Sequence, residues 1–329
     1  MPVEEAGAAP AGRSRLAIAI PAYGRAAAIA NSVAAMAEEA GAEALDVVFL
    51  ISDDTPDTSV RDALRPLIDA GLPVRYRQNT PALRHDRNLI ATLLWPDADY
   101  VWLLGSAHRV KPGQLARVYR FLDEQDLVFV NYHVADDHRV IPMLNGEAAR
   151  TFLHGKLWHQ TLTGVTIYGR TVRDWVAGRG DDLRVVTDFP QVSVMLGYAS
   201  DRDVTIGWFG EPCLQWSGSK TASYWQSRAV EVFVDHWAAV VAAFPVAVPP
   251  DRRAGVVREH SARTDLFNTT SLIRQRQAGQ FGWRSLTRRH FREAMHLPLW
   301  KLLMLAALPM PVLQAGGPIL GRAKRLMRR

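Results

Sequence analysis

The chain has 329 residues, of which 48% are hydrophobic and 22% charged, a composition that is typical of a soluble globular protein and excludes a wholly disordered chain. The formal net charge is +6, but residues 281–329 carry ten Lys or Arg against one acid, a net +9 that leaves about −3 for the first 280 residues. Because the basic character belongs to the tail, nucleic-acid binding by the folded body is not expected. The one cysteine, Cys213, excludes an internal disulfide and an all-cysteine metal site, and fits a reducing cytoplasm.

The first 132 residues alternate between apolar runs and helical patterns. Residues 1–14 are expected to be a disordered lead-in without the apolar core of a signal peptide. We predict strands at 16–20, 46–52, 74–77, 100–104 and 127–132, with helices at 26–39, 59–70 and 84–94 and another that begins at Pro112. Strands separated by helices pair in parallel through right-handed crossovers, so residues 15–132 are predicted to form an open, doubly wound sheet. Ligands of such sheets lie beyond the carboxyl ends of the strands, which places the loops at Pro21, Asp53 and Gly105 around one crevice.

After residue 132 the alternation is weaker. We predict a hairpin at 133–143, strands at 164–168 and 204–209, and helices at 188–198 and 222–244. No clean linker separates the two halves, so residues 133–250 are predicted to complete the same domain. Residues 251–329 are predicted to form a helical extension.

Three of the predicted strand ends resemble the opening motifs of family 2 glycosyltransferases, which have the GT-A fold. The first motif is IAIPAYGR at residues 18–25, where Gly24 takes a position at which Asn is usual. The second is ISDDTPD at residues 51–57, and the third is YVWLLG at residues 100–105, followed by KPG at 111–113. Beyond residue 132 a weaker similarity to the abequosyltransferase-like branch rests on Gly164 and the pair Phe189-Pro190. The resemblance implies a glycosyltransferase with a GT-A type doubly wound, mostly parallel sheet flanked by helices, and with a C-terminal helical appendage.

The resemblance also implies where a nucleotide-sugar donor binds. In the family an aspartate after the second strand touches the base or the ribose, which indicates Asp53 and Asp54. The alternative is that these residues form a helix N-cap turn, although Asp57 or Thr58 fits the cap better. The predicted donor nucleotide-binding residues are Pro21, Ala22, Tyr23, Arg25, Asp53, Asp54, Arg84 and Asn88.

The third motif departs from the family pattern. Family members follow it with aspartates that hold Mg²⁺ or Mn²⁺ on the donor diphosphate, whereas this chain has SAHRVK at residues 106–111. Magnesium requires hard oxygen ligands, and one imidazole with one serine makes a poor Mn²⁺ site. Cationic side chains can offset the charge of a leaving diphosphate without a metal. We therefore predict no metal ligands and a diphosphate site made of Ser106, His108, Arg109 and Lys111; an unrecognised Mn²⁺ or Mg²⁺ site and a non-catalytic domain are the alternatives.

An inverting sugar transfer requires a carboxylate base for the acceptor hydroxyl. The family places it in the second half, where Asp188 is the first choice and Asp182, beside Asp181, is the second. The competing interpretation is that Asp188 caps the helix that follows it. Trp216 and Trp225 are predicted to form a sugar-stacking wall for the acceptor, with burial in the core as the alternative.

The tail has an apolar stretch at residues 297–320 that contains Lys301 and four prolines. Its uninterrupted part is too short to cross a membrane. Basic residues on both flanks favour an in-plane or re-entrant anchor on an anionic cytoplasmic leaflet; the alternative is a core helix with a solvated basic tail. The flanking residues are Arg284, Arg288, Arg289, Arg292, Arg322, Lys324, Arg325, Arg328 and Arg329.

Together these observations predict an enzyme of polysaccharide and cell-envelope biosynthesis. It would move a sugar from a nucleotide diphosphate to a glycan or polyprenyl-linked acceptor, with inversion, and would be cytoplasmic and peripheral on the inner face of the cell membrane. One alternative is a non-catalytic scaffold with the same fold. Another is a protein that binds nucleic acid or anionic lipid through its tail alone.

Overall fold

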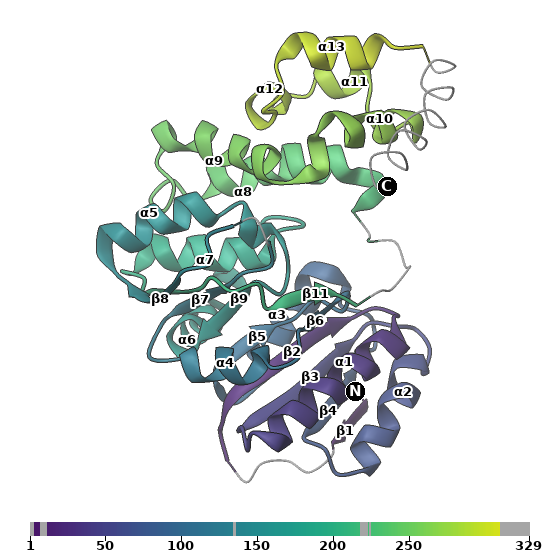
Figure 1. The fold of residues 1–329 in the computed structure, drawn as a ribbon, viewed down its shortest axis with the longest axis vertical. Coiled ribbons are helices and arrows are strands. Elements are labelled where there is room, and N and C mark those ends of the chain that lie inside the picture. Colours follow the sequence, from purple (N-terminus) through teal and green to yellow (C-terminus); the bar gives the residue numbers. More distant parts are fainter. Residues whose placement is uncertain (1–2, 7–11, 134–135, 218–222, 224, 310–329) are drawn as a thin grey trace, which may run out of the picture. The chain divides into compact units, whose positions relative to one another are not determined.

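The chain forms two compact units, Met1–Thr221 and Ala222–Arg329. The computed structural model describes residues 3–6, 12–133, 136–217, 223 and 225–309 (Figure 1). The boundary between the units falls inside the predicted 133–250 segment, so residues 222–250 belong to the second unit.

The first unit is built on a mixed sheet whose described strands run in the order β1-β4-β3-β2-β5-β9-β7-β10-β8. Six strands, β2, β3, β4, β5, β7 and β10, run in one direction, and β1, β8 and β9 oppose them. The predicted mostly parallel sheet is therefore confirmed. The strands are β1 (Val3–Ala6), β2 (Ser14–Ala22), β3 (Val47–Asp53), β4 (Val74–Gln78), β5 (Ala98–Leu103), β7 (Leu127–Val130), β8 (Val140–Leu144), β9 (Thr166–Gly169) and β10 (Ile206–Phe209).

The sheet differs from the sequence prediction at both edges and at its centre. Val3–Ala6, in the expected disordered lead-in, pairs antiparallel with β4 and so covers an edge whose backbone groups would otherwise be unpaired. β9 lies between β5 and β7 and is antiparallel to both, so β5 and β7 are not neighbours. The predicted hairpin at 133–143 is not formed, because β8 pairs with the distant β10.

Helices cover both faces of the sheet. One face carries α1 (Ala26–Ala42), α2 (Ser59–Asp69) and α4 (Gln114–Phe121), whose apolar residues join one core with β2, β3 and β5. On the other face α3 (Arg84–Leu94), α6 (Arg170–Arg179) and α7 (Pro190–Asp201) contact one another. Because β2 and β3 are buried on both faces, they have continuous apolar sequences rather than alternating ones.

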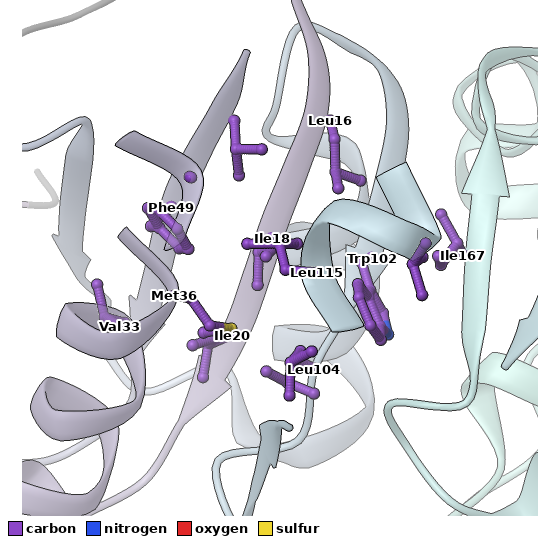
Figure 2. Packing of buried hydrophobic residues seen from close by; sticks show 14 of the residues in the cluster. Leu16, Ile18, Ile20, Val33, Met36, Phe49, Trp102, Leu104, Leu115 and Ile167 are labelled. Carbon is purple, nitrogen blue, oxygen red and sulfur yellow. The ribbon is translucent and has the colours of Figure 1, made fainter. Parts of the chain in front are cut away.

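The core fixes the strand ends from which the candidate site is built. Figure 2 shows Ile18 and Ile20 of β2 and Trp102 of β5 beside Met36 of α1 and Leu115 of α4. Trp102 is fully buried, and its indole N–H donates to the Gly164 carbonyl at 2.7 Å. This bond ties the loop before β9 to the end of β5.

A second sheet follows the end of β5. β6 (His108–Val110) pairs antiparallel with β11 (Leu214–Trp216), so that His108 lies opposite Trp216. This strand could not be predicted from the sequence, where residues 106–111 resemble a loop. A three-residue strand with a distant partner has no local periodicity. The remaining elements of this unit are α5 (Gly146–Lys156), η1 (His159–Thr161) and η2 (Gly180–Asp182).

The second unit is helical over its described residues. In it Trp237 donates its indole N–H to the Val257 carbonyl at 3.1 Å, and α13 packs against α10 and α11. None of the described helices is both long and apolar enough to cross a membrane. The elements are η3 (Gln226–Arg228), η4 (Glu231–His236), α8 (Trp237–Ala243), α9 (Pro250–Arg263), η5 (Asp265–Phe267), α10 (Thr269–Gln277), α11 (Trp283–Leu286), α12 (Phe291–Ala294) and α13 (Leu299–Ala307). The end of the predicted basic tail, residues 310–329, lies outside the described residues.

Candidate functional site

The carboxyl ends of the parallel strands β2, β3, β4 and β5 lie at one edge of the sheet. The loops that follow these strands contain most of the residues predicted to bind the donor. α3 begins after the loop that follows β4, and α7 begins beside α3. This edge is therefore the candidate site, in the position at which open α/β sheets bind ligands.

At the end of β3 a carboxylate is held entirely inside the protein. Asp53 has no exposed surface. Its Oδ1 accepts from the Thr55 backbone N–H at 2.8 Å and from the Thr55 hydroxyl at 2.5 Å, and its Oδ2 accepts from the Tyr76 hydroxyl at 2.9 Å. Burial raises the pKa of Asp53, and these hydrogen bonds oppose the shift. The structure thus places Asp53 inside the protein at the end of β3, where its hydrogen bonds support the loop that follows.

The neighbouring polar side chains extend this support to β4 and α3. Asp54 Oδ1 accepts from Asn79 Nδ2 and from the Leu83 backbone N–H, both at 2.9 Å. Asn88 is buried and donates from Nδ2 to the Ser52 carbonyl at 3.0 Å. The strand ends are therefore joined by a hydrogen-bonded network, which we call the β3 network: Ser52, Asp53, Asp54, Thr55, Tyr76, Asn79 and Asn88. Sequence reasoning missed Ser52, Tyr76 and Asn79 in it, although Asn79 lies only two residues after the predicted strand at 74–77.

The loop after β2 positions an arginine over the end of β5. Gly24 and Arg25 both have left-handed backbones, with φ of 63° and 59°. The Gly24 N–H donates to the Thr55 hydroxyl at 2.7 Å, which fixes this turn on the β3 network. Arg25 directly precedes α1, and its Nη1 donates to Ser106 Oγ at 3.2 Å. A left-handed backbone is strained for a residue other than glycine, and such strain is concentrated at functional sites.

The other residues predicted on this loop differ in exposure. Pro21 is half-buried and Ala22 is buried, because both belong to β2. Tyr23 is 70% exposed, so its ring is available to a ligand at the strand end.

The turn after β5 presents a buried histidine. The His108 N–H donates to the Gly105 carbonyl at 2.9 Å, which closes the turn around Ser106 and Ala107. The imidazole is 8% exposed and meets Tyr132 and Trp216 edge-on, with ring centroids at 5.6 and 5.7 Å. Burial and, to a smaller extent, the charge of Arg25 lower the pKa of His108 to about 4. His108 is therefore neutral at pH 7 and does not supply the fixed positive charge that the sequence analysis expected from it.

The two other cations predicted at this turn lie elsewhere on it. Arg109 is exposed, whereas its neighbours His108 and Val110 are buried, so Arg109 projects from the opposite face of β6. Lys111 follows β6, and its backbone N–H donates to the Cys213 carbonyl at 2.8 Å. The structure thus brings Arg25, rather than Arg109 or Lys111, into hydrogen-bond contact with Ser106.

The side chains of this turn do not suit a divalent metal. Ser106 offers one hydroxyl, Ala107 offers no ligand and His108 offers one imidazole, whereas Mg²⁺ is held by several hard oxygen ligands. Within the described part of the chain no group of three or more His, Cys, Asp or Glu residues could hold a metal ion. The residues present therefore do not fit the Mg²⁺ or Mn²⁺ site that the family resemblance implies.

Asp188 lies at the start of α7, beside α3. It is buried, has a left-handed backbone with φ of 68°, and donates its N–H to Asp86 Oδ2 at 3.2 Å. Asp86 also contacts His85 Nδ1 through its Oδ1 at 2.7 Å. The N-cap position of α7 is occupied by Phe189 and not by Asp188, and the Phe189 side chain makes no capping hydrogen bond.

The remaining predicted residues are distributed more widely. Arg84 is exposed, begins α3 and has φ of 64°. Asp182 is exposed in η2, three residues after Arg179, which pairs with Asp201 at the last residue of α7. Arg179, three residues before Asp182, thus pairs with the end of α7 opposite Asp188.

The two tryptophans predicted for the acceptor belong to different units. Trp216 is 42% exposed on β11 in the first unit. Trp225 lies in the second unit, edge-on to Phe233 at 5.2 Å. Tyr132, which was not among the predicted site residues, contacts His108 together with Trp216.

Residues 17–173 match the model of the Glycosyl transferase family 2 domain. This segment of the chain belongs to glycosyl transferase family 2. The family 2 domain contains the three strand-end motifs and the turn after β5, so the resemblance deduced from the sequence is confirmed.

The chain is also similar to individual proteins. A segment of 91 residues is 30% identical to abequosyltransferase RfbV of Salmonella typhimurium, and it spans 26% of each protein. Crystal structures of S. aureus TarS 1–349 in complex with UDP and with UDP-GlcNAc superpose with a TM-score of 0.52, at 13% and 12% identity, over 80% of this chain and 78% of TarS 1–349. The family match shows a glycosyltransferase domain, and the superposition shows the GT-A fold.

Proposed function

We propose that the chain transfers a sugar from a nucleotide-diphosphate donor to an acceptor hydroxyl. The observation that carries this proposal is the carboxyl edge of a family 2 domain, where the β3 network holds the loops of Tyr23, Arg25 and Ser106 in one place. TarS, which shares the fold, has been crystallised with UDP and with UDP-GlcNAc. In this proposal the base and ribose lie near Tyr23 and the β3 network, and the diphosphate lies near the turn after β5.

The proposed reaction inverts the sugar carbon. The acceptor oxygen forms a bond to that carbon while the bond to the diphosphate oxygen breaks, and the diphosphate leaves with the electron pair. Asp188 takes the proton of the acceptor hydroxyl. Its burial at the start of α7 and the bond from its N–H to Asp86 hold the residue in one orientation, as a general base requires.

The proposed acceptor is a glycan or a polyprenyl-linked precursor at the inner face of the cell membrane. Support comes from the second unit, in which α13 buries Leu302, Leu305 and Ala306 and exposes its other apolar side chains. Exposed apolar and basic side chains together favour an anionic lipid surface. The exposed residues of this kind are Trp283, Arg284, Arg289, Arg292, Leu299, Trp300, Leu303 and Met304.

A donor screen tests the proposed function. The full chain is mixed with sugar nucleotides of each base, with and without Mn²⁺, and its melting temperature is followed together with hydrolysis or transfer of the sugar. A glycosyltransferase is stabilised by one nucleotide class and turns the donor over. Stabilisation without turnover across all acceptors would instead indicate the non-catalytic scaffold, and no stabilisation by any sugar nucleotide would refute donor binding.

A further inference from the structure

A glycosyl transfer from a nucleotide diphosphate needs positive charge at the leaving group. Negative charge grows on the diphosphate as the bond to the sugar breaks, and an enzyme must stabilise it with a metal or with fixed donors. The turn after β5 lacks the oxygen ligands for a divalent metal, as described above. The charge must therefore come from elsewhere at the carboxyl edge.

Arg25 is the cation that hydrogen bonds hold at this turn. Its Nη1 bonds Ser106 Oγ across 81 residues of sequence. Its backbone is fixed by the preceding Gly24 N–H, which donates to Thr55, and by the start of α1. The guanidinium is always charged and carries five N–H donors in a planar fork, a geometry that matches the oxygens of phosphate groups.

His108 adds a second polar group to the same turn. Its Nδ1 is buried and has no hydrogen-bond partner among the described residues. A Cβ at Gly105 would lie 3.3 Å from this Nδ1 and 3.0 Å from the Thr163 carbonyl oxygen, so a larger residue at position 105 would crowd the ring nitrogen. A buried, unpartnered ring nitrogen is costly, and a hydrogen bond with a bound ligand would remove that cost.

We propose that Arg25, together with Ser106 and His108, binds the donor diphosphate as a metal-free site. The inference rests on the proposed function and changes its electrostatics, because the cation comes from the loop after β2 rather than from Arg109 or Lys111. Arg25 pairs with the diphosphate before and after the bond to the sugar breaks. Ser106 and His108 orient it through their neutral polar groups.

The test is calorimetric binding to the full chain in EDTA. The probes are UDP, GDP, CDP and dTDP, each compared with its own nucleoside. We expect one diphosphate to bind wild type in EDTA, and Arg25→Ala to weaken it about 10- to 100-fold, the loss expected for a charge-assisted hydrogen bond. Binding of the matching nucleoside should change less than about threefold, because the base and ribose do not contact the guanidinium.

Two further variants separate charge from folding. Arg25→Asn suits the left-handed backbone and removes the charge, so it should melt like wild type yet bind the diphosphate as weakly as Arg25→Ala. Arg120→Ala is the matched control, because Arg120 is an exposed arginine that pairs with Glu43, the residue after α1, at the end of that helix opposite Arg25.

The outcomes distinguish this inference from the proposed function. Diphosphate binding that is unchanged in both Arg25 variants, or that is absent in EDTA and restored by Mn²⁺, overturns the metal-free site and leaves the glycosyltransferase proposal intact. A larger loss in Arg109→Ala than in Arg25→Ala would reassign the cation to β6. If no diphosphate binds under either condition, donor binding fails and the metal-free site fails with it.

Discussion

The ends of β3 and β5 lie at the same edge of one sheet, yet they differ in how far their polar groups are satisfied. At β3, both carboxylate oxygens of Asp53 accept hydrogen bonds from within the protein. At β5, His108 Nδ1 is buried without a partner among the described residues. The loop that meets this turn includes Arg25 in a strained backbone conformation.

This difference indicates a division of roles between the two strand ends, one structural and one in ligand binding. A network whose acceptors are occupied stabilises the fold, because each bond offsets the cost of burying its partners. Groups left unpartnered or strained are where a ligand can supply the missing interaction. We therefore propose that the acids at the end of β3 mainly support the fold and that the arginine of the β2 loop contacts the ligand.

The largest effect is expected at Asp188, the strained residue at the start of α7. Asp188→Asn should lower kcat about 100- to 10,000-fold, because general-base catalysis contributes that much, and should leave nucleotide diphosphate binding unchanged. Asparagine tolerates the left-handed backbone at this position. Steady-state transfer kinetics and calorimetric binding measure the two effects. Asp203→Asn, at an exposed carboxylate that pairs with Arg150, is the control, and an active Asp188→Asn would assign the base elsewhere.

The next effect concerns stability at the β3 end. Asp53→Ala should lower the free energy of unfolding by about 2–4 kcal/mol, because the Thr55 and Tyr76 donors lose their acceptor in a buried site. Tyr76→Phe removes one of these bonds and should cost about 1 kcal/mol. Urea unfolding followed by tryptophan fluorescence measures both. If Asp53→Ala is as stable as wild type but loses nucleotide binding, Asp53 is a ligand contact and the proposed division is wrong.

A smaller effect is expected from pH at the β5 end. The pKa of His108 is lowered to about 4 in the folded protein, below the ordinary histidine value near 6.5, so the unfolded chain takes up a proton that the folded chain does not. The contribution of His108 to the free energy of unfolding is therefore fully present above pH 6.5 and is lost as the pH falls toward 4. His108→Gln should reduce this pH slope by up to about 1.4 kcal/mol per pH unit.

Unfolding titrations at pH 4.5, 5.5, 6.5 and 7.5 measure that slope. His159 and His260 are also buried, and burial lowers the pKa of each to about 3, so the slope should fall in His108→Gln without vanishing. An unchanged slope would show that His108 has the same pKa in the folded and the unfolded chain, and the β5 end would then gain a second positive charge only below about pH 6.5.

The smallest effect is expected in the second unit, where α13 has one buried face and one exposed apolar face. Replacing both Trp300 and Leu303 with serine should weaken binding to vesicles of phosphatidylglycerol and phosphatidylcholine by about tenfold or more, because it removes exposed apolar area. Vesicle sedimentation measures the partition. Val246→Ser alters an apolar residue that is 57% exposed in the same unit and serves as the control. Equal binding by all three proteins would remove α13 from the membrane contact.

Local sequence patterns determined the fold class of the first unit and the position of its candidate site. The continuous apolar runs of β2 and β3 and the helical patterns between the strands predict a doubly wound sheet, because burial on both faces leaves no alternation. Pro21, Asp53 and Gly105 each follow such a run, so the edge that forms the candidate site could be located from the sequence. The family resemblance rests on these same residues.

Only the tertiary structure decided which of those residues contact one another. Arg25 is hydrogen-bonded to Ser106, which lies 81 residues away in the sequence, and Asp188 is hydrogen-bonded to Asp86, which lies 102 residues away. Two strand pairings are also long-range: β9 lies between β5 and β7, and β6 pairs with β11. Periodicity records which face of an element is buried, but it does not record the partner, because partners are selected by packing and loop closure over the whole chain. For that reason the sequence indicated a cationic diphosphate site at residues 106–111, and the fold placed an arginine from the first loop beside it.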